Sequence, residues 1–236
     1  MKKSFIRVVA IFSFGLIHAG GVLAAEVPED VSAAIKKFQV LPNYSWTTTT
    51  EMPDAPFRVL PVSGMADTNG FAVLTSTAGK KVAVAKGDMC VLKTSSGWKT
   101  AAVLGEVKDP ADGDLLNTKT PPDELAVLVP KLSGWKPEGE NAFSGELESA
   151  SAKIYLLSSM KGRGPGGFTP KIQSSSGKFQ LWLKDGFPQK YTLVINASVS
   201  LPFGTKAVTR ISTTEITDVG KTKFEVPAEA QSALEK

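Results

Sequence analysis

The residue types that most often carry enzyme chemistry are scarce in this chain. Its only histidine is His18, and its only cysteine is Cys90. His18 lies in an N-terminal segment with the pattern of a cleaved export signal, so we expect a mature chain without imidazole. This excludes Ser-His-Asp and Cys-His catalysis, and zinc sites built on histidine or several cysteines. We expect no cofactor and no metal, and we interpret Cys90 as a small buried hydrophobe.

The first 24 residues predict a signal peptide. Three basic residues precede an apolar run at residues 8–23, and Val22-Leu23-Ala24 offers small residues for cleavage. The run is shorter than the about 20 residues of a membrane span, and no cysteine stands at the cleavage point to carry a lipid. We therefore expect residues 25–236 to form one soluble domain, periplasmic or secreted, without a transmembrane segment.

The charge balance indicates no nucleic-acid partner. The chain has 27 Lys and Arg against 23 Asp and Glu, and three of the basic residues lie in the predicted signal. The mature chain is therefore nearly neutral, which gives no strong attraction to a phosphate backbone.

An oxygen-only metal site was the remaining possibility. Asp109, Asp112 and Asp114 have a spacing loosely typical of a calcium loop, but the glycine and the final bidentate glutamate of such a loop are missing. We interpret residues 109–122, rich in Asp, Pro and Gly, as a long solvated loop.

A glycine-rich segment at residues 162–167 has a superficial likeness to a phosphate-binding loop. No helix start follows it, and the Gly-Lys-Ser/Thr ending is absent, so we interpret it as a flexible surface loop. Gly162, Arg163 and Gly164 are candidates for a lid over a cavity mouth, where Arg163 could meet an acidic headgroup.

The first half predicts one helix followed by strands. Apolar residues at helical spacing predict a helix over residues 28–39. Short β-rich segments separated by turn residues then suggest an antiparallel meander. The expected strands are Tyr44 to Glu51, Phe71 to Ser76, Lys81 to Lys86, Met89 to Lys93 and Trp98 to Leu104.

Two further helices are expected in the middle of the chain. Leu125, Leu128, Val129 and Leu132 have helical spacing, and Pro130 should kink or shorten that helix. Residues 146–157 fit a helix, although residues 153–157 fit a strand nearly as well.

The last third contains the clearest hairpin. Residues 179–184 and 191–195 alternate between apolar and polar, and Asp185-Gly186 forms the turn between them. Residues 207–217 predict another strand, and residues 223–226 a final short one. Together these elements predict an α+β fold with a sheet that wraps around helices.

Two segments resemble the LolA-like and LppX-like envelope proteins. The first is the "strand, Asp-Gly, apolar-Pro, strand" unit at residues 181–191, and the second is the ending at residues 214–230. The resemblance implies a strongly curved, open antiparallel half-barrel with helices on its concave side. It also implies a hydrophobic cavity between sheet and helices that holds acyl chains.

A hydrophobic cavity is also expected on physical grounds. If the helices leave apolar surface of the sheet uncovered, a stable protein must close that surface by collapse, cover it with a partner or fill it with a ligand. Period-two apolar residues are otherwise simply the core face of a sheet. The cavity candidates are Trp46, Phe71, Val73, Val82, Val84, Trp98, Phe179, Leu181, Leu183, Tyr191, Leu193 and Ile195.

Two functions fit the sequence. The first is a non-catalytic carrier or binder of lipid or another hydrophobic molecule in the bacterial envelope. The alternative is an envelope protein that binds or scaffolds a protein partner and has a solid core. An enzyme that uses carboxylates alone ranks third, and no residue can be named for it. A cavity of several hundred Å³ would favour the carrier, and a close-packed interior the scaffold.

Overall fold

The computed structural model describes residues 26–55, 57–76, 81–104, 109–160, 171–201 and 204–235. The predicted signal peptide at residues 1–24 and the predicted lid at Gly162, Arg163 and Gly164 lie outside these residues. Among the described residues, no helix has the length and hydropathy to cross a bilayer.

One sheet of 11 strands forms the body of the protein. The strands are β1 (Tyr44–Glu51), β2 (Val62–Ala66), β3 (Phe71–Ser76), β4 (Lys81–Lys86), β5 (Met89–Thr94), β6 (Gly97–Thr100), β7 (Leu132–Pro137), β8 (Ala142–Leu147), β9 (Lys171–Lys184), β10 (Phe187–Leu201) and β11 (Gly204–Thr217). Their order is β6-β5-β4-β3-β2-β1-β11-β10-β9-β8-β7. Strands β6 and β7 are the two edges, so the sheet is open.

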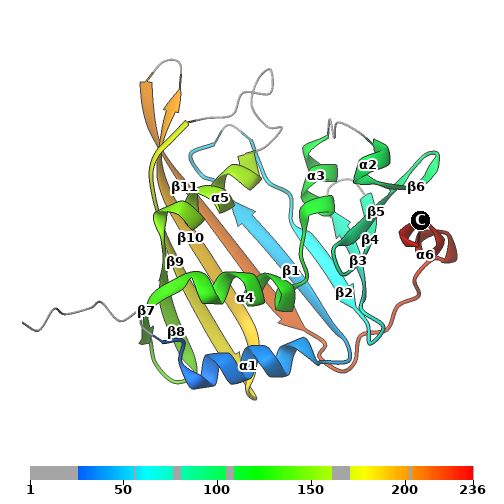
Figure 1. Cartoon of the computed structure of the whole chain (residues 1–236), viewed down its shortest axis with the longest axis horizontal. Helices are drawn as coiled ribbons and strands as arrows, with labels where there is room; N and C mark the ends of the chain where they lie inside the picture. Colours follow the sequence, from blue (N-terminus) through cyan, green and yellow to red (C-terminus); the bar gives the residue numbers. More distant parts are fainter. Residues whose placement is uncertain are drawn as a thin grey trace, which may run out of the picture.

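Every neighbouring pair of strands is antiparallel. Two meanders, β1 to β6 and β7 to β11, join through the pairing of β1 with β11. This junction brings together residues more than 160 positions apart, such as Thr50 and Ser212. The fold class predicted from the sequence, an α+β open antiparallel half-barrel around helices, is confirmed (Figure 1).

Helices cover both faces of the sheet, but unequally. All of them except the C-terminal helix supply side chains to the main core cluster or lie against it, and we call the face that they cover the inner face. Figure 1 shows α1, α4 and α5 crossing in front of the long strands. The helices are α1 (Glu29–Gln39), α2 (Ala101–Leu104), α3 (Pro110–Asn117), α4 (Pro121–Leu128), the 3-10 turn η1 (Val129–Lys131), α5 (Ser149–Met160) and α6 (Ala228–Leu234).

Helix α6 packs against the opposite side of β4, β5 and β6, which we call the outer face. There Ala230 and Leu234 form a separate small core with Val84 and Val91. Strand alternation explains the division, because Ala83 and Leu92 on the same two strands belong to the main core. The part of the sheet formed by β4 and β5 therefore has buried side chains on both faces.

Sequence and structure agree closely in the predicted hairpin. Asp185 and Gly186 have φ values of 54° and 74°, which is the left-handed backbone that a two-residue hairpin turn requires. The flanking strands β9 and β10 pair as predicted. The helix expected at residues 28–39 is α1, and the helix-or-strand alternative at residues 146–157 is resolved as α5. Pro130 shortens α4 as expected, because the chain continues there as η1, but Leu132, which was expected in this helix, begins β7.

Three local predictions were wrong. The expected loop at residues 109–122 contains α3, which begins because the Asp109 side chain accepts a hydrogen bond from the Ala111 N–H and Pro110 occupies the first turn. The strand expected to end at Leu104 ends at Thr100, where α2 begins. The strand expected at residues 223–226 is a segment that pairs with no strand in the described part of the chain. Strands β2, β7 and β8 and helix α6 were not predicted.

Candidate ligand-binding site

The structure divides the twelve predicted cavity residues between the two faces. The inner face carries Trp46, Phe179, Leu181, Leu183, Tyr191, Leu193 and Ile195. The outer face carries Phe71, Val73, Val84 and Trp98 beside α6, together with Val82, which pairs with Thr75 on the same face. The sequence shows strand alternation but not which parity faces which side, so the two sets could not be separated beforehand. Their role in ligand binding stays a prediction.

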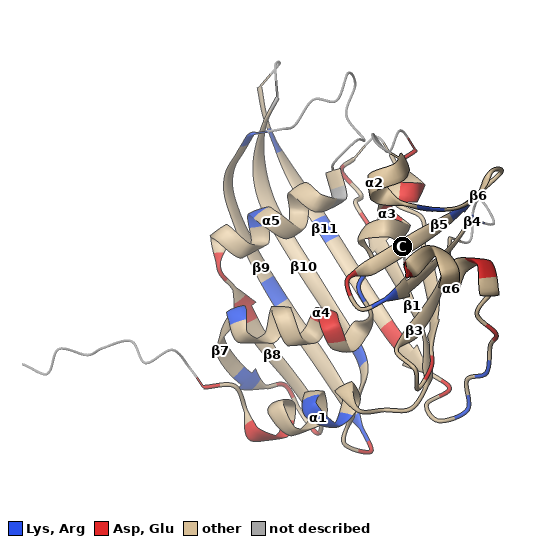
Figure 2. Ribbon diagram, turned by 45° about the vertical axis from the view of Figure 1, so that its right-hand side comes forward, with Lys and Arg blue, Asp and Glu red and all other residues tan. Residues whose placement is uncertain are grey.

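The inner face has an apolar floor on β9 and β10. Phe179 pairs with Leu193, and Leu181 pairs with Tyr191, so their side chains lie next to each other on this face. Strand β10 carries a single charged residue, Lys190, among its 15 residues, and Figure 2 shows it almost entirely uncharged. A floor of this kind can hold apolar chains through burial alone.

Aromatic rings line the same face in two groups. The rings of Trp135 and Phe179 lie 6.0 Å apart in an edge-on arrangement, and Tyr191 lies 6.0 Å from Phe179 on its other side. Phe38, on α1, and Trp46 each pack against Tyr44. Such contacts fix the orientation of large side chains.

A polar stripe borders the apolar floor, where β1 meets β11. Thr48 and Thr214 form a hydrogen bond of 2.9 Å across the two strands, and Thr50 and Ser212 one of 3.1 Å. Arg210 continues the stripe along β11, on the same face as Ile195, with which it pairs. The inner face therefore offers apolar surface and hydrogen-bonding groups side by side.

A carboxylate from the covering helices reaches this stripe. The hydroxyl group of Tyr191 donates a hydrogen bond of 2.5 Å to Glu124 Oε2, on α4. Burial raises the pKa of Glu124, although the hydrogen bond and the charge of Arg210 act in the opposite direction. Burial also raises the pKa of Tyr191 well above its usual value, and the charge of Glu124 adds to the increase.

Several buried polar atoms on the inner face have no hydrogen-bond partner. Within the described residues, these unpartnered atoms are Trp46 Nε1, Ser76 Oγ, Trp135 Nε1, and Nε and Nη1 of Arg210. Ser76 pairs with Val62 of the main core, and the other residues have the inner-face positions described above. Buried polar groups in proteins are almost always hydrogen-bonded, so five exceptions on one face call for a specific explanation.

Glu124 and Arg210 were not singled out from the sequence. Glu124 precedes the apolar residues of a short helix, and the sequence does not show that its carboxylate meets Tyr191 of a distant strand. Arg210 carried a usable signal, because it shares strand parity with Val208 and Ile216, both of which are buried. A charged residue whose neighbours on the same parity, Val208 and Ser212, are both buried stands at an unusual position.

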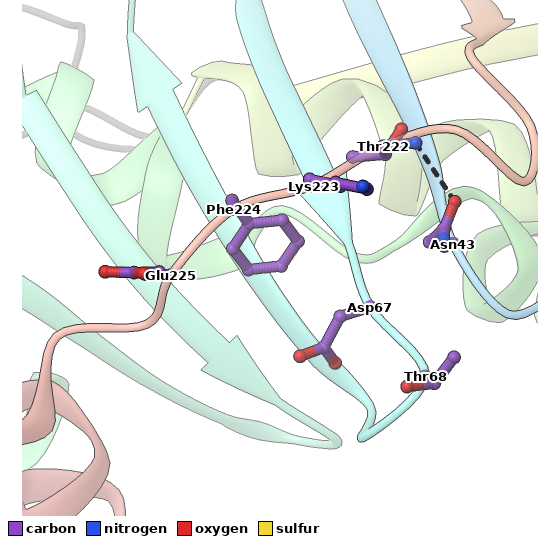
Figure 3. Close-up of a pocket in the computed structure, with 7 residues that line it drawn as sticks. All are labelled: Asn43, Asp67, Thr68, Thr222, Lys223, Phe224 and Glu225. Atoms are coloured by element: carbon purple, nitrogen blue, oxygen red, sulfur yellow. Dashed lines mark hydrogen bonds between the residues drawn. The ribbon is translucent and has the colours of Figure 1, made fainter.

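The surface pockets lie elsewhere. A pocket of about 560 Å³ is lined by Asn43, Asp67, Thr68 and residues 222–225 (Figure 3). Its polar groups maintain local structure, since Asp67 accepts hydrogen bonds from the backbone of its own turn and Asn43 accepts one from the Thr222 N–H. A second pocket of about 370 Å³ is lined by residues 174–176 and 196–198. None of the twelve predicted residues lines either pocket.

The remaining candidates have structural roles. Cys90 lies partly buried on β5, with Sγ 4.0 Å from the Leu115 carbonyl oxygen of α3. Asp109 and Asp112 both bind Lys81, at 2.6 and 2.5 Å, and so attach α3 to β4. Among the described residues, no cluster of three His, Cys, Asp or Glu side chains could hold a metal ion.

The fold and this interior define an open antiparallel half-barrel whose covering helices enclose apolar and polar groups together. No protein-family model and no curated protein matches the chain. Among solved structures, the chain is similar to the LolA superfamily protein NE2245 from Nitrosomonas europaea. The two share 12% sequence identity with a TM-score of 0.33, over 86% of this chain and 96% of that one. This is the superfamily that residues 181–191 and 214–230 of the sequence resemble.

Proposed function

We propose that this protein binds an amphipathic, lipid-like molecule between its inner face and helices α4 and α5, and carries it without transforming it. The observation that carries the proposal is the coincidence, on one face, of the apolar floor with five unpartnered buried polar atoms. Acyl chains gain about 0.8 kcal/mol for each CH₂ that they bury. A polar headgroup would supply the hydrogen-bond acceptors that the unpartnered N–H groups require.

Ligand entry requires movement of the helices. Phe179, Leu181 and Ile195 have an exposed fraction of 0%, so the floor is covered in this structure. Helix α4 has only eight residues, and its Glu124 side chain is held to the sheet by Tyr191. A rigid-body shift of α4 and α5 away from β9 and β10 would open the floor without breaking the sheet.

A second function, recognition of a protein partner, is favoured by apolar side chains on the solvent side of the same helices. Val127 on α4 is 41% exposed, and Ile154 on α5 is 65% exposed. Exposed apolar surface of this kind often marks a contact with another protein. The complete burial of Phe179, Leu181 and Ile195 on the inner face also suits a solid core.

Lipid extraction distinguishes the two functions. The mature protein, purified from a bacterial host, is extracted with organic solvent, and the lipid is quantified by mass spectrometry against the protein. Stoichiometric lipid, together with displacement of a fluorescent fatty acid, is the expected result. Absence of both, with one dominant protein captured by cross-linking in the periplasm, would reject the carrier in favour of the scaffold.

A pair of neighbouring substitutions locates the site. Leu193 faces the inner floor, and Val194 faces the opposite side of the same strand. We expect Leu193→Asn to reduce fatty-acid binding severalfold, while Val194→Asn leaves it within about twofold, since only Leu193 would contact the chain. Circular dichroism checks that both variants fold. Equal binding by the two folded variants would place the ligand elsewhere.

A further inference from the structure

Arg210 occupies an unusual position for a cation. It lies in the interior of β11, paired with Ile195, which is completely buried. The residues two positions away on the same face are Val208 and Ser212, and both are buried. A guanidinium group in such surroundings loses much of its hydration, which is costly unless other groups replace the water.

The hydrogen bonds of the guanidinium group do not compensate for this loss. Its Nε and Nη1 atoms are shielded from solvent and have no partner among the described residues. Within the part of the chain that the structure describes, Nη2 makes a single long contact, of 3.5 Å, with Ser212 Oγ. A guanidinium group has five N–H donors in a planar arrangement that matches the oxygens of a carboxylate or phosphate.

Neighbouring groups stabilise the charge of Arg210 in part, without filling these donor positions. Glu124 from α4 and Asp114 from α3 act on Arg210 through charge, as does Tyr155 from α5. Glu124 Oε2 accepts its hydrogen bond from Tyr191. Burial nevertheless lowers the pKa of Arg210, so these charges do not fully compensate for the loss of hydration.

We infer that Arg210 binds the anionic headgroup, a carboxylate or a phosphate, of the amphipathic molecule whose apolar chains lie on β9 and β10. This assignment rests on the proposed function, and it adds the chemical class of the ligand. The distance between charge and floor is short, because Arg210 is the direct neighbour of Ile195 and lies two pairs along the ladder from Leu193, on the same face. The headgroup would occupy the polar stripe and the chains the apolar floor.

The test compares ligands that share a chain but differ in headgroup. Oleate and oleyl alcohol are titrated against a bound fluorescent probe, and a short-chain phosphatidylglycerol is titrated beside the diacylglycerol of the same chain length. We expect the wild-type protein to prefer the anionic member of at least one pair by about tenfold or more, the range of a charge-assisted hydrogen bond. Preference in the first pair identifies a carboxylate, and preference in the second a phosphate.

The substitution Arg210→Gln should remove this preference and leave the affinity for the neutral ligand within about twofold. Arg210→Lys should keep part of it, because it retains the charge but not the planar donors. Arg58→Gln, the same change at an exposed arginine, is the matched control and should keep the full preference.

Three results would overturn the assignment. Equal wild-type affinity for charged and neutral ligands would reject it, and this measurement holds even if Arg210→Gln does not fold. A preference that survives in folded Arg210→Gln would place the headgroup elsewhere. If the wild-type protein binds none of the four ligands, the proposed function itself fails, which separates that failure from loss of headgroup selectivity alone.

Discussion

The hydroxyl group of Tyr191, on β10, donates a hydrogen bond of 2.5 Å to the carboxylate of Glu124, on α4. The two residues are 67 positions apart, and their contact links the inner face of the sheet to a helix that covers it. Tyr191 is only 3% exposed, so water does not compete for its hydroxyl group.

We expect Tyr191→Phe to destabilise the protein by about 1–3 kcal/mol, because it leaves a partly buried carboxylate without its hydrogen-bond donor. Urea denaturation measures the change. The control is Thr192→Ala at the next position of the strand, which removes only a part-buried hydrogen bond to Thr213. A larger loss at Thr192 than at Tyr191 would contradict the assigned role.

The pH dependence of stability should carry a contribution from Glu124. Its pKa in the folded protein lies above the ordinary value near 4.5, so the unfolded chain releases this proton first as the pH rises. The contribution to the free energy of unfolding is therefore fully present below about pH 4.5 and is lost as the pH rises through the folded pKa. The difference in the free energy of unfolding between the wild type and Glu124→Gln, measured across this pH range, should fall with increasing pH. A rise, or the same profile for Glu140→Gln at an exposed turn, would contradict the prediction.

Gly64 on β2 makes room for the indole ring of Trp46 on β1. A Cβ atom at position 64 would lie 2.2 Å from Trp46 Cζ2, so Gly64→Ala must displace the ring. We expect a cost of about 1–3 kcal/mol in urea denaturation. Gly145→Ala is the control, because its Cβ would lie 3.3 Å from Leu132 Cβ and needs a smaller adjustment. The prediction fails if the two variants lose equal stability.

Helix α6 protects apolar side chains of the outer face. Leu234 is 3% exposed and packs with Ala230, Val84 and Val91. We expect Leu234→Asp to release α6 and to increase the binding of an apolar dye, because burial of an unpaired carboxylate is unfavourable. Ser232→Asp, at an exposed position of the same helix, should leave dye binding unchanged. Unchanged dye binding by Leu234→Asp would show that α6 does not provide this protection.

Cys90 should react slowly with thiol reagents. Burial raises its pKa to about 11, and the thiolate is the reactive form. At neutral pH we expect modification about a hundredfold slower in the native protein than in the unfolded chain, followed by the absorbance of the released chromophore. The control is Met89→Cys combined with Cys90→Ser, which places the thiol at a side chain that is 52% exposed. Equal rates for the two native proteins would contradict the prediction.

Local signals in the sequence identified many elements correctly because the forces that shape them are local. Asp185-Gly186 adopts a left-handed backbone in any hairpin of this length, and the alternation around it predicted β9 and β10. The start of α3 also had a local signal, Asp109 followed by Pro110, but the acidic composition of the segment outweighed it. Strand β2 had no comparable signal, because its Gly64 leaves space for the Trp46 ring and does not itself favour a strand.

The sequence by itself determined the fold class, the alternation of apolar residues along the strands and the scarcity of catalytic side chains. Only the tertiary structure decided which parity faces the helices, because period two is the same on either side of a strand. It also brought Arg210, Glu124 and Tyr191 together from β11, α4 and β10. Pairing of β1 with β11 and packing of α4 on the sheet create these neighbours across long stretches of chain, and no spacing within one segment contains that information.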